Sequence, residues 1–202
     1  MRSAVKSGAA LAALFFCGLV RAAAPLAATS APIGERVQAC YACHGAAGQS
    51  QQPETPSLGG QPSFFLLTQL FLFREGRRGG PMIELAKGWS DDELRGFADF
   101  LSAKLAPPGP PGDAPDAARL ARARALIATE HCAVCHNPDF SGRAQMPRLA
   151  HQREDYLLKS LREFKSGKRI GYGQAMSQEL ARLSDQDLAD LAHYLAHYPQ
   201  PR

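Results

Sequence analysis

The pattern Cys-x-x-Cys-His occurs twice in this chain of 202 residues, at 40–44 and at 132–136. In such a pattern two thiols can bond to the two vinyl groups of one porphyrin, while the imidazole that follows points at its iron. A redox dithiol or half of a zinc site also uses paired cysteines, but neither requires a histidine directly after both pairs. We therefore predict two covalently attached haem c groups, bound through Cys40, Cys43, Cys132 and Cys135.

The N-terminus has the features of an export signal. Arg2 and Lys6 precede an apolar stretch over 8–20, and small residues follow Arg21. The apolar stretch is too short to span a bilayer. We expect a cleavable signal peptide over 1–28, cut between about 22 and 28, and hence a periplasmic protein. The alternative is an uncleaved membrane anchor.

Loss of this signal changes what charge and cysteine content imply. Three basic residues and no acidic one leave with it, so the formal net charge falls from +4 to about +1. This charge, with basic and acidic residues interleaved, gives no indication of nucleic-acid binding. Cys17 also leaves, so haem attachment accounts for every remaining cysteine and no disulfide framework is expected.

A proline-rich run divides the mature chain. Residues 106–116 contain five prolines and two glycines. Such a run cannot continue a helix, and it makes a stiff, extended linker. We expect a first domain over 29–105 and a second domain over 117–202.

The two expected domains are copies of one unit, because short motifs recur in both in the same order. These motifs are P-x-L-x-x-Q at 56–61 and 147–152, aromatic-Leu-Leu at 65–67 and 156–158, F-x-x-G-[KR]-R at 73–78 and 164–169, and S-D-x-[DE]-L at 90–94 and 184–188. Self-similarity of this kind predicts the same fold twice.

Each unit is predicted to be all-α. Apolar residues recur at helical spacing over 33–42, 64–74, 116–128 and 187–197, and no segment alternates as a strand would. Two serines, each with an acid three residues later, are expected to begin the last helix of each unit, and two glycines to end an earlier one. These residues are Ser90 with Glu93, Ser184 with Asp187, Gly76 and Gly167. A unit of about eighty residues is marginal alone, so we expect the porphyrin to form part of each core.

The sixth position of each iron decides between an electron carrier and a catalyst. Met82 lies 38 residues after His44, and Met176 lies 40 after His136, each in a glycine-rich loop before the last helix of its unit. We predict that these four residues are the axial ligands. A thioether opposite an imidazole raises the reduction potential, and a filled sixth site leaves no room for a small-molecule substrate at the iron.

A ligand histidine usually donates its other N–H to a fixed acceptor. Pro56 lies 12 residues after His44 and Pro147 lies 11 after His136. We predict that the two proline carbonyls are these acceptors, with two ordinary loop prolines as the alternative. The basic residues of the F-x-x-G-[KR]-R motifs either neutralise haem propionates or form solvated turns. Expected not to bind iron are His131, His151, His193 and His197.

The order of these motifs resembles that of the di-haem cytochromes c4 over nearly the whole mature chain. The resemblance implies two class I cytochrome c domains related by pseudo-twofold symmetry, each a small helical fold around one covalent haem with His/Met ligation. It also implies a periplasmic carrier that passes electrons from a dehydrogenase or quinol-oxidising complex to a terminal oxidase or other acceptor. The sequence departs from the family pattern in the compressed loop before Met82 and in His151, which interrupts the second P-x-L-x-x-Q motif.

Two other functions remain open. A similar two-haem module serves as the electron-transfer subunit of periplasmic dehydrogenases such as the flavocytochrome sulfide dehydrogenases. A haem enzyme would need an open or unusually ligated iron, and Met82 and Met176 argue against it. We expect redox proteins as partners, namely a terminal oxidase, a dehydrogenase or a cytochrome complex. Peripheral association with a membrane is compatible with this role.

The two units differ in charge. Residues 32–105 contain seven basic and eight acidic residues, whereas residues 117–202 contain thirteen and nine. A dipole of this kind orients a carrier as it approaches a charged partner. We predict that the second unit meets an acidic partner surface.

Overall fold

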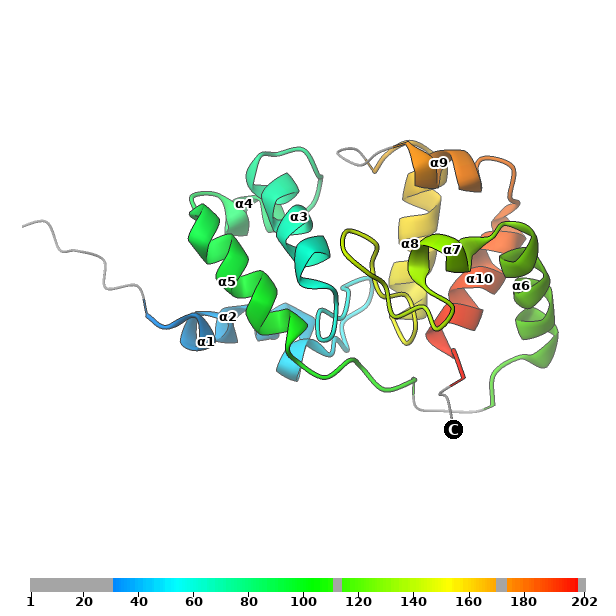
Figure 1. The fold of residues 1–202 in the computed structure, drawn as a ribbon, viewed down its shortest axis with the longest axis horizontal. Helices are drawn as coiled ribbons and strands as arrows, with labels where there is room; N and C mark the ends of the chain where they lie inside the picture. Colours follow the sequence, from blue (N-terminus) through cyan, green and yellow to red (C-terminus); the bar gives the residue numbers. More distant parts are fainter. Residues whose placement is uncertain (1–30, 111–113, 170–173, 200–202) are drawn as a thin grey trace, which may run out of the picture. The chain divides into compact units, whose positions relative to one another are not determined.

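The computed structural model describes residues 31–110, 114–169 and 174–199, and the fold reported below is that of these residues. The expected signal peptide and residues 111–113 of the expected linker lie outside them. The described residues form ten α-helices and one 3-10 helix, and they contain no strand, only one isolated bridge between Arg143 and Met146. The all-α prediction is therefore confirmed (Figure 1). Within these residues no helix combines the length and apolar character needed to cross a bilayer.

The first half of the chain builds a core between α3 and α5. Its elements are α1 (Ile33–Arg36), α2 (Gln38–His44), η1 (Ala46–Gly48), α3 (Ser63–Arg74), α4 (Met82–Ala86) and α5 (Asp91–Ser102). Helix α3 packs against α4 and α5, and α1 packs against α5. Apolar side chains of these helices are buried together with Val37, which lies at the turn between α1 and α2. The helix predicted over 33–42 is thus divided at Val37.

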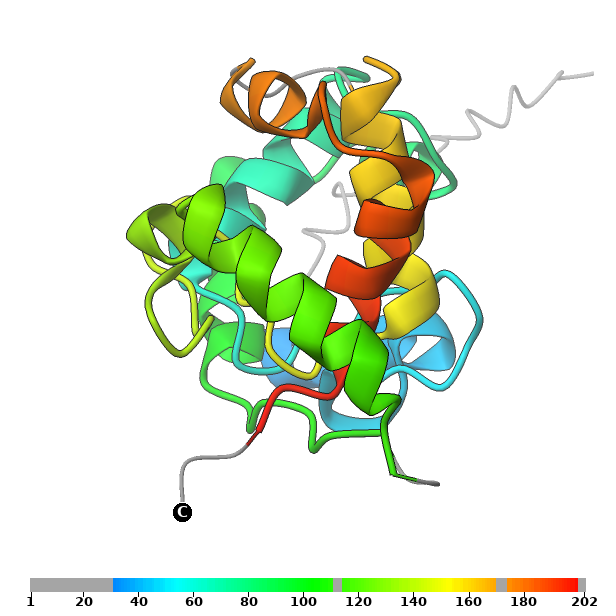
Figure 2. The ribbon, with the colours of Figure 1, turned by 90° about the vertical axis from the view of Figure 1, so that its right-hand side faces the viewer.

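The second half repeats this arrangement. Its elements are α6 (Ala117–Thr129), α7 (Cys132–His136), α8 (Glu154–Lys165), α9 (Ala175–Leu180) and α10 (Asp185–Ala196). Helix α10 packs against α6 and α8, and α8 packs against α9 (Figure 2). Leucines of α8 and α10 form the centre of the core, and Leu188 is fully buried.

The predicted capping residues start and stop the helices as expected. Ser90 Oγ accepts from the backbone N–H of Glu93 at 3.2 Å, and the Glu93 carboxylate accepts from the Ser90 N–H at 2.6 Å. Ser184 and Asp187 make the same reciprocal pair at the start of α10. Such caps satisfy N–H groups that have no partner within the helix. Gly76 follows the last turn of α3 with a φ of 63°, a conformation that glycine adopts without steric cost.

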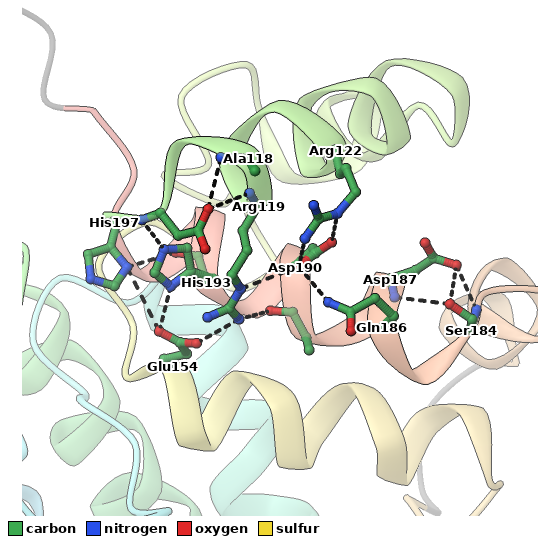
Figure 3. Close-up of polar contacts among 12 residues, drawn as sticks. Ala118, Arg119, Arg122, Glu154, Ser184, Gln186, Asp187, Asp190, His193 and His197 are labelled. Atoms are coloured by element: carbon green, nitrogen blue, oxygen red, sulfur yellow. Dashed lines mark hydrogen bonds and ion pairs between the residues drawn. The ribbon is translucent and has the colours of Figure 1, made fainter. Parts of the chain in front are cut away.

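A buried carboxylate ties α6 to α10 (Figure 3). The Asp190 side chain is 1% exposed and lies 2.5 Å from Nε of Arg122 and 3.3 Å from Nε of Arg119. Gln186 Nε2 donates to the same carboxylate at 2.9 Å. These donors, with Arg122 the strongest, hold the pKa of Asp190 below its ordinary value despite burial.

Candidate haem sites

The first Cys-x-x-Cys-His motif forms helix α2, which ends at His44. Gly45 then turns the chain with a φ of 75°, and a Cβ at this position would lie 2.0 Å from the Gln49 carbonyl oxygen. Only glycine fits such a close approach. The buried imidazole of His44 lies with Nδ1 2.8 Å from the carbonyl oxygen of Pro56, the acceptor that we predicted.

The second motif forms α7, which ends at His136 in the same way. Asn137 takes the place of glycine with a φ of 69°, a conformation that asparagine tolerates better than most residues. Its side-chain amide donates to the Gly142 carbonyl at 2.9 Å, which holds the turn. Nδ1 of the buried His136 lies 3.1 Å from the carbonyl oxygen of Pro147.

Both imidazoles are arranged to bind a metal through Nε2. Burial lowers the pKa of His44 and of His136, because a charged ring loses its hydration there. The rings are therefore neutral at physiological pH. Since a carbonyl oxygen can only accept, each Nδ1 carries the proton and each Nε2 presents a lone pair. Nε2 of His136 is buried and has no hydrogen-bond partner among the described residues. An iron ligand is the arrangement that satisfies such an atom.

The cysteines are placed for thioether formation on the same helical face as each histidine. Residues three and four apart share one face of a helix, so Cys40, Cys43 and His44 can meet one porphyrin. Cys40 and Cys132 are half-buried, and burial raises the pKa of both thiols. Cys43 and Cys135 are exposed, and all four are free thiols in the structure.

The two methionines occupy equivalent positions, but not the loops that we predicted for them. Met82 is the first residue of α4 and Met176 the second residue of α9, so both lie in short helices. Each is half-buried, and Met176 packs against the core of the second half. Pro81 precedes α4, where its fixed φ suits the start of a helix. The role of both methionines as axial ligands stays a prediction.

Two arginines from the repeated F-x-x-G-[KR]-R motifs converge on one buried phenol. Arg78 Nη2 lies 3.1 Å and Arg169 Nη2 lies 3.3 Å from the hydroxyl of Tyr156. Burial raises the pKa of Tyr156, but the two guanidinium charges outweigh it and lower the pKa to about 7. Such surplus positive charge suits the carboxylates of haem propionates. Sequence reasoning considered the arginines but missed Tyr156, which could have been found as the counterpart of Phe65 in the repeat.

A cluster of Glu154, His193 and His197 has ligand atoms within 4.8 Å of one another, but its protons argue against a metal site (Figure 3). Nε2 of His193 accepts from the backbone N–H of Asp116 at 3.1 Å, so Nδ1 carries the proton and donates to Glu154 at 2.9 Å. Nδ1 of His197 donates to the His193 carbonyl. The cluster therefore joins α8 to α10, as Ser63 and Asp99 join α3 to α5.

Comparison with known proteins agrees with this geometry. The cytochrome c family model matches residues 120–199. Cytochrome c4 of Pseudomonas aeruginosa is 31% identical over 197 residues, which cover 92% of this chain and 94% of that protein. The chain belongs to the di-haem cytochrome c4 family. It is therefore an electron-transfer cytochrome with two covalently bound haem c groups, as the sequence predicted, and its partners are redox proteins.

Solved structures show the same fold. Reduced cytochrome c4 from Pseudomonas stutzeri superposes with a TM-score of 0.73 at 28% identity, covering 82% of this chain and 96% of that chain. Thiosulfate dehydrogenase from Marichromatium purpuratum superposes with a TM-score of 0.68 at 28% identity, covering 79% of this chain but 36% of that chain. The prediction of tandem class I cytochrome c domains is confirmed.

Proposed function

We propose that the chain is a periplasmic electron carrier between a dehydrogenase or quinol-oxidising complex and a terminal oxidase or other acceptor. His44 and Met82 bind one iron, and His136 and Met176 bind the other. The observation that carries this proposal is the buried Nε2 of His136, which has no partner among the described residues while Nδ1 is held by Pro147. The proposed chain consists of a signal peptide over 1–28, a domain over 29–105, a linker over 106–116 and a domain over 117–202.

The protein's contribution is to hold each site rigid. Bound haem supplies a one-electron change at iron without loss or gain of ligands. Pro56 and Pro147 set the orientation of the two imidazoles through their carbonyl oxygens. Arg78 and Arg169 offset propionate charge. Fixed ligands and a filled sixth position favour outer-sphere transfer over chemistry at the metal.

The oxidised spectrum of the purified holoprotein tests this proposal. We expect two low-spin haems, the weak near-red band of Met–Fe(III) at an intensity for two irons, and uptake of two electrons per chain on reduction. The measurement is an absorption spectrum with a redox titration. High-spin features in the resting protein would instead indicate an open iron and an enzyme.

A dedicated subunit of a dehydrogenase is the second candidate. The thiosulfate dehydrogenase electron acceptor of Stutzerimonas stutzeri is 37% identical over 67 residues, which cover 31% of this chain and 31% of that protein. Purification from native cells distinguishes the two functions. A free carrier separates from other redox proteins at moderate salt, whereas a subunit stays with its enzyme at a constant ratio.

The excess positive charge of the second half supports an acidic partner surface. Arg162 and Lys168 are exposed, and Lys165 lies beside them on the last turn of α8. Replacing all three with glutamine is expected to weaken the salt dependence of electron transfer by about one to two charge pairs and to slow association at low salt about tenfold. Stopped-flow kinetics with an acidic redox partner over a range of ionic strengths measures both.

A matched variant removes the same charge from the first half. Lys87 and Arg95 are exposed, and Lys104 lies over the ring of Phe100. Replacing these three with glutamine is expected to change the salt slope less than the second-half variant does. Equal slopes for the two variants would refute an oriented approach through the second half.

A further inference from the structure

Two buried glutamines cross between the halves of the chain. Gln61 and Gln152, the last residues of the two P-x-L-x-x-Q motifs, are 4% and 5% exposed. Gln152 Oε1 accepts from the Ser57 N–H at 2.8 Å, and its Nε2 donates to the Ser57 carbonyl at 2.9 Å. Gln61 makes the same two bonds with the backbone of Arg148, both at 2.9 Å. Each side-chain amide thus pairs with one residue 87 or 95 positions away in the chain.

Each glutamine reaches the peptide group that holds the other half's iron-binding histidine. The peptide bond between Pro56 and Ser57 contributes its carbonyl oxygen to Nδ1 of His44 at 2.8 Å and its N–H to Gln152. The same holds in the second half, where the peptide after Pro147 bonds to His136 at 3.1 Å and its N–H bonds to Gln61. An unbroken chain of hydrogen bonds therefore joins each imidazole to the opposite half.

Such a chain has a direction of polarisation. Hydrogen bonds in series strengthen one another, most of all away from water. An acceptor on the N–H of a peptide makes its carbonyl oxygen more negative, so that oxygen holds the Nδ1 proton of the histidine more strongly. A more strongly held proton leaves the imidazole richer in electrons and a better donor to iron. This favours Fe(III), and it lowers the reduction potential of that haem.

We propose that Gln61 and Gln152 are positioning residues, each of which lowers the reduction potential of the haem in the opposite half of the chain. Gln152 acts on the haem of His44, and Gln61 acts on the haem of His136. The inference rests on the proposed axial role of the two histidines. It means that each haem is tuned by the docking of the two halves and not by its own domain alone.

The test is a crossed pair of substitutions in the holoprotein. Gln152→Met removes the amide at nearly constant volume, and we expect the ratio of reduced to oxidised iron at the His44 haem to rise roughly threefold at fixed solution potential. The His136 haem should stay within a smaller change. Gln61→Met should give the reverse pattern. Potentials are measured by redox titration with NMR signals of each haem, and the Nδ1–H resonance of the affected histidine should move in the reduced protein.

Two further variants separate tuning from a purely structural role. Gln152→Glu keeps an acceptor for the Ser57 N–H and loses only the donor, so the potential of the His44 haem should not rise. Loosening of the interface would raise it in both Gln152 variants. Lys159→Gln removes the ion pair with Glu54, at 3.0 Å and with both side chains well exposed, which joins the same two halves away from the peptide chain. It should leave both potentials unchanged.

The proposal is overturned if either methionine variant shifts the haem of its own half, shifts both haems equally, or shifts neither. If Gln152→Met yields no holoprotein, Gln61→Met alone decides between these outcomes. Failure of the proposed function has a different signature. It would be seen as loss of low-spin ligation in the unmodified protein, whereas intact spectra with unshifted potentials refute the glutamine tuning alone.

Discussion

Replacing Met176 with Ala is expected to remove half of the near-red Met–Fe(III) band and to leave the other half unchanged. The thioether is a soft ligand that favours Fe(II), so its loss should also lower the potential of one haem and open that iron to water or added ligands. Met82→Ala should give the same half-loss at the other iron. The measurement is the oxidised absorption spectrum, with binding of imidazole or cyanide as a second readout.

Met146 offers the matched control for this prediction. It is half-buried like the other two methionines, but it lies only ten residues after His136 and forms an isolated backbone bridge with Arg143. Met146→Ala should keep the full band. A band that survives both Met82→Ala and Met176→Ala would show that other groups occupy the sixth positions.

Asp190→Asn is expected to destabilise the second half by about 2 kcal/mol at neutral pH. The substitution leaves donors from Arg122, Arg119 and Gln186 facing an amide at a position that is 1% exposed. Loss of one partner from a buried ion pair costs about 3–5 kcal/mol, and the half-exposed Arg122 reduces this because it can be hydrated. Denaturant unfolding of the holoprotein, followed by far-ultraviolet circular dichroism, gives the difference in free energy.

The pH dependence of this difference has a defined sign. The pKa of Asp190 is lower in the folded protein than its ordinary value of 3.8, chiefly because Arg122 donates to the carboxylate. The stabilisation is therefore complete above pH 3.8 and is lost as the pH falls through the lower pKa of the folded state. The free energies of the two proteins should converge in acid. A difference that stays constant down to that range would assign the effect to packing.

An exposed pair on the same helix is the control. Asp185 lies 2.7 Å from Arg162, with side chains 68% and 52% exposed. Exposed ion pairs contribute about 0–1 kcal/mol, and the helix N-terminus adds a similarly small term. Asp185→Asn should therefore cost less than 1 kcal/mol. An equal loss for both variants would contradict the importance of burial.

Features encoded by neighbouring residues could be predicted from the sequence. The two capping boxes and the turn at Gly76 depend on residues one to four positions apart, and the structure confirms them. Haem attachment and the tandem fold were predicted from motif spacing, and the family relationship confirms them. The surroundings of Met82 were predicted less well, because the glycine and proline before it were taken for a loop although α4 begins there.

Contacts between the halves could not be predicted in this way. The repeat showed that Gln61 and Gln152 recur, but nothing near them in the chain indicates that each pairs with the opposite half. Tyr156 was likewise recognised only as an aromatic position, and its place between two arginines depends on how the halves pack.

The sequence by itself determined that two haems are attached, that each lies in a helical unit, and that each unit offers one histidine and one later methionine. These properties follow from short-range spacing, because thioether bonds, helix caps and linker prolines act on neighbouring residues. Only the tertiary structure decided that the peptide groups holding His44 and His136 are each bonded to a glutamine of the other half. Hydrogen bonds across so many residues depend on the packing of both cores, which no local pattern specifies.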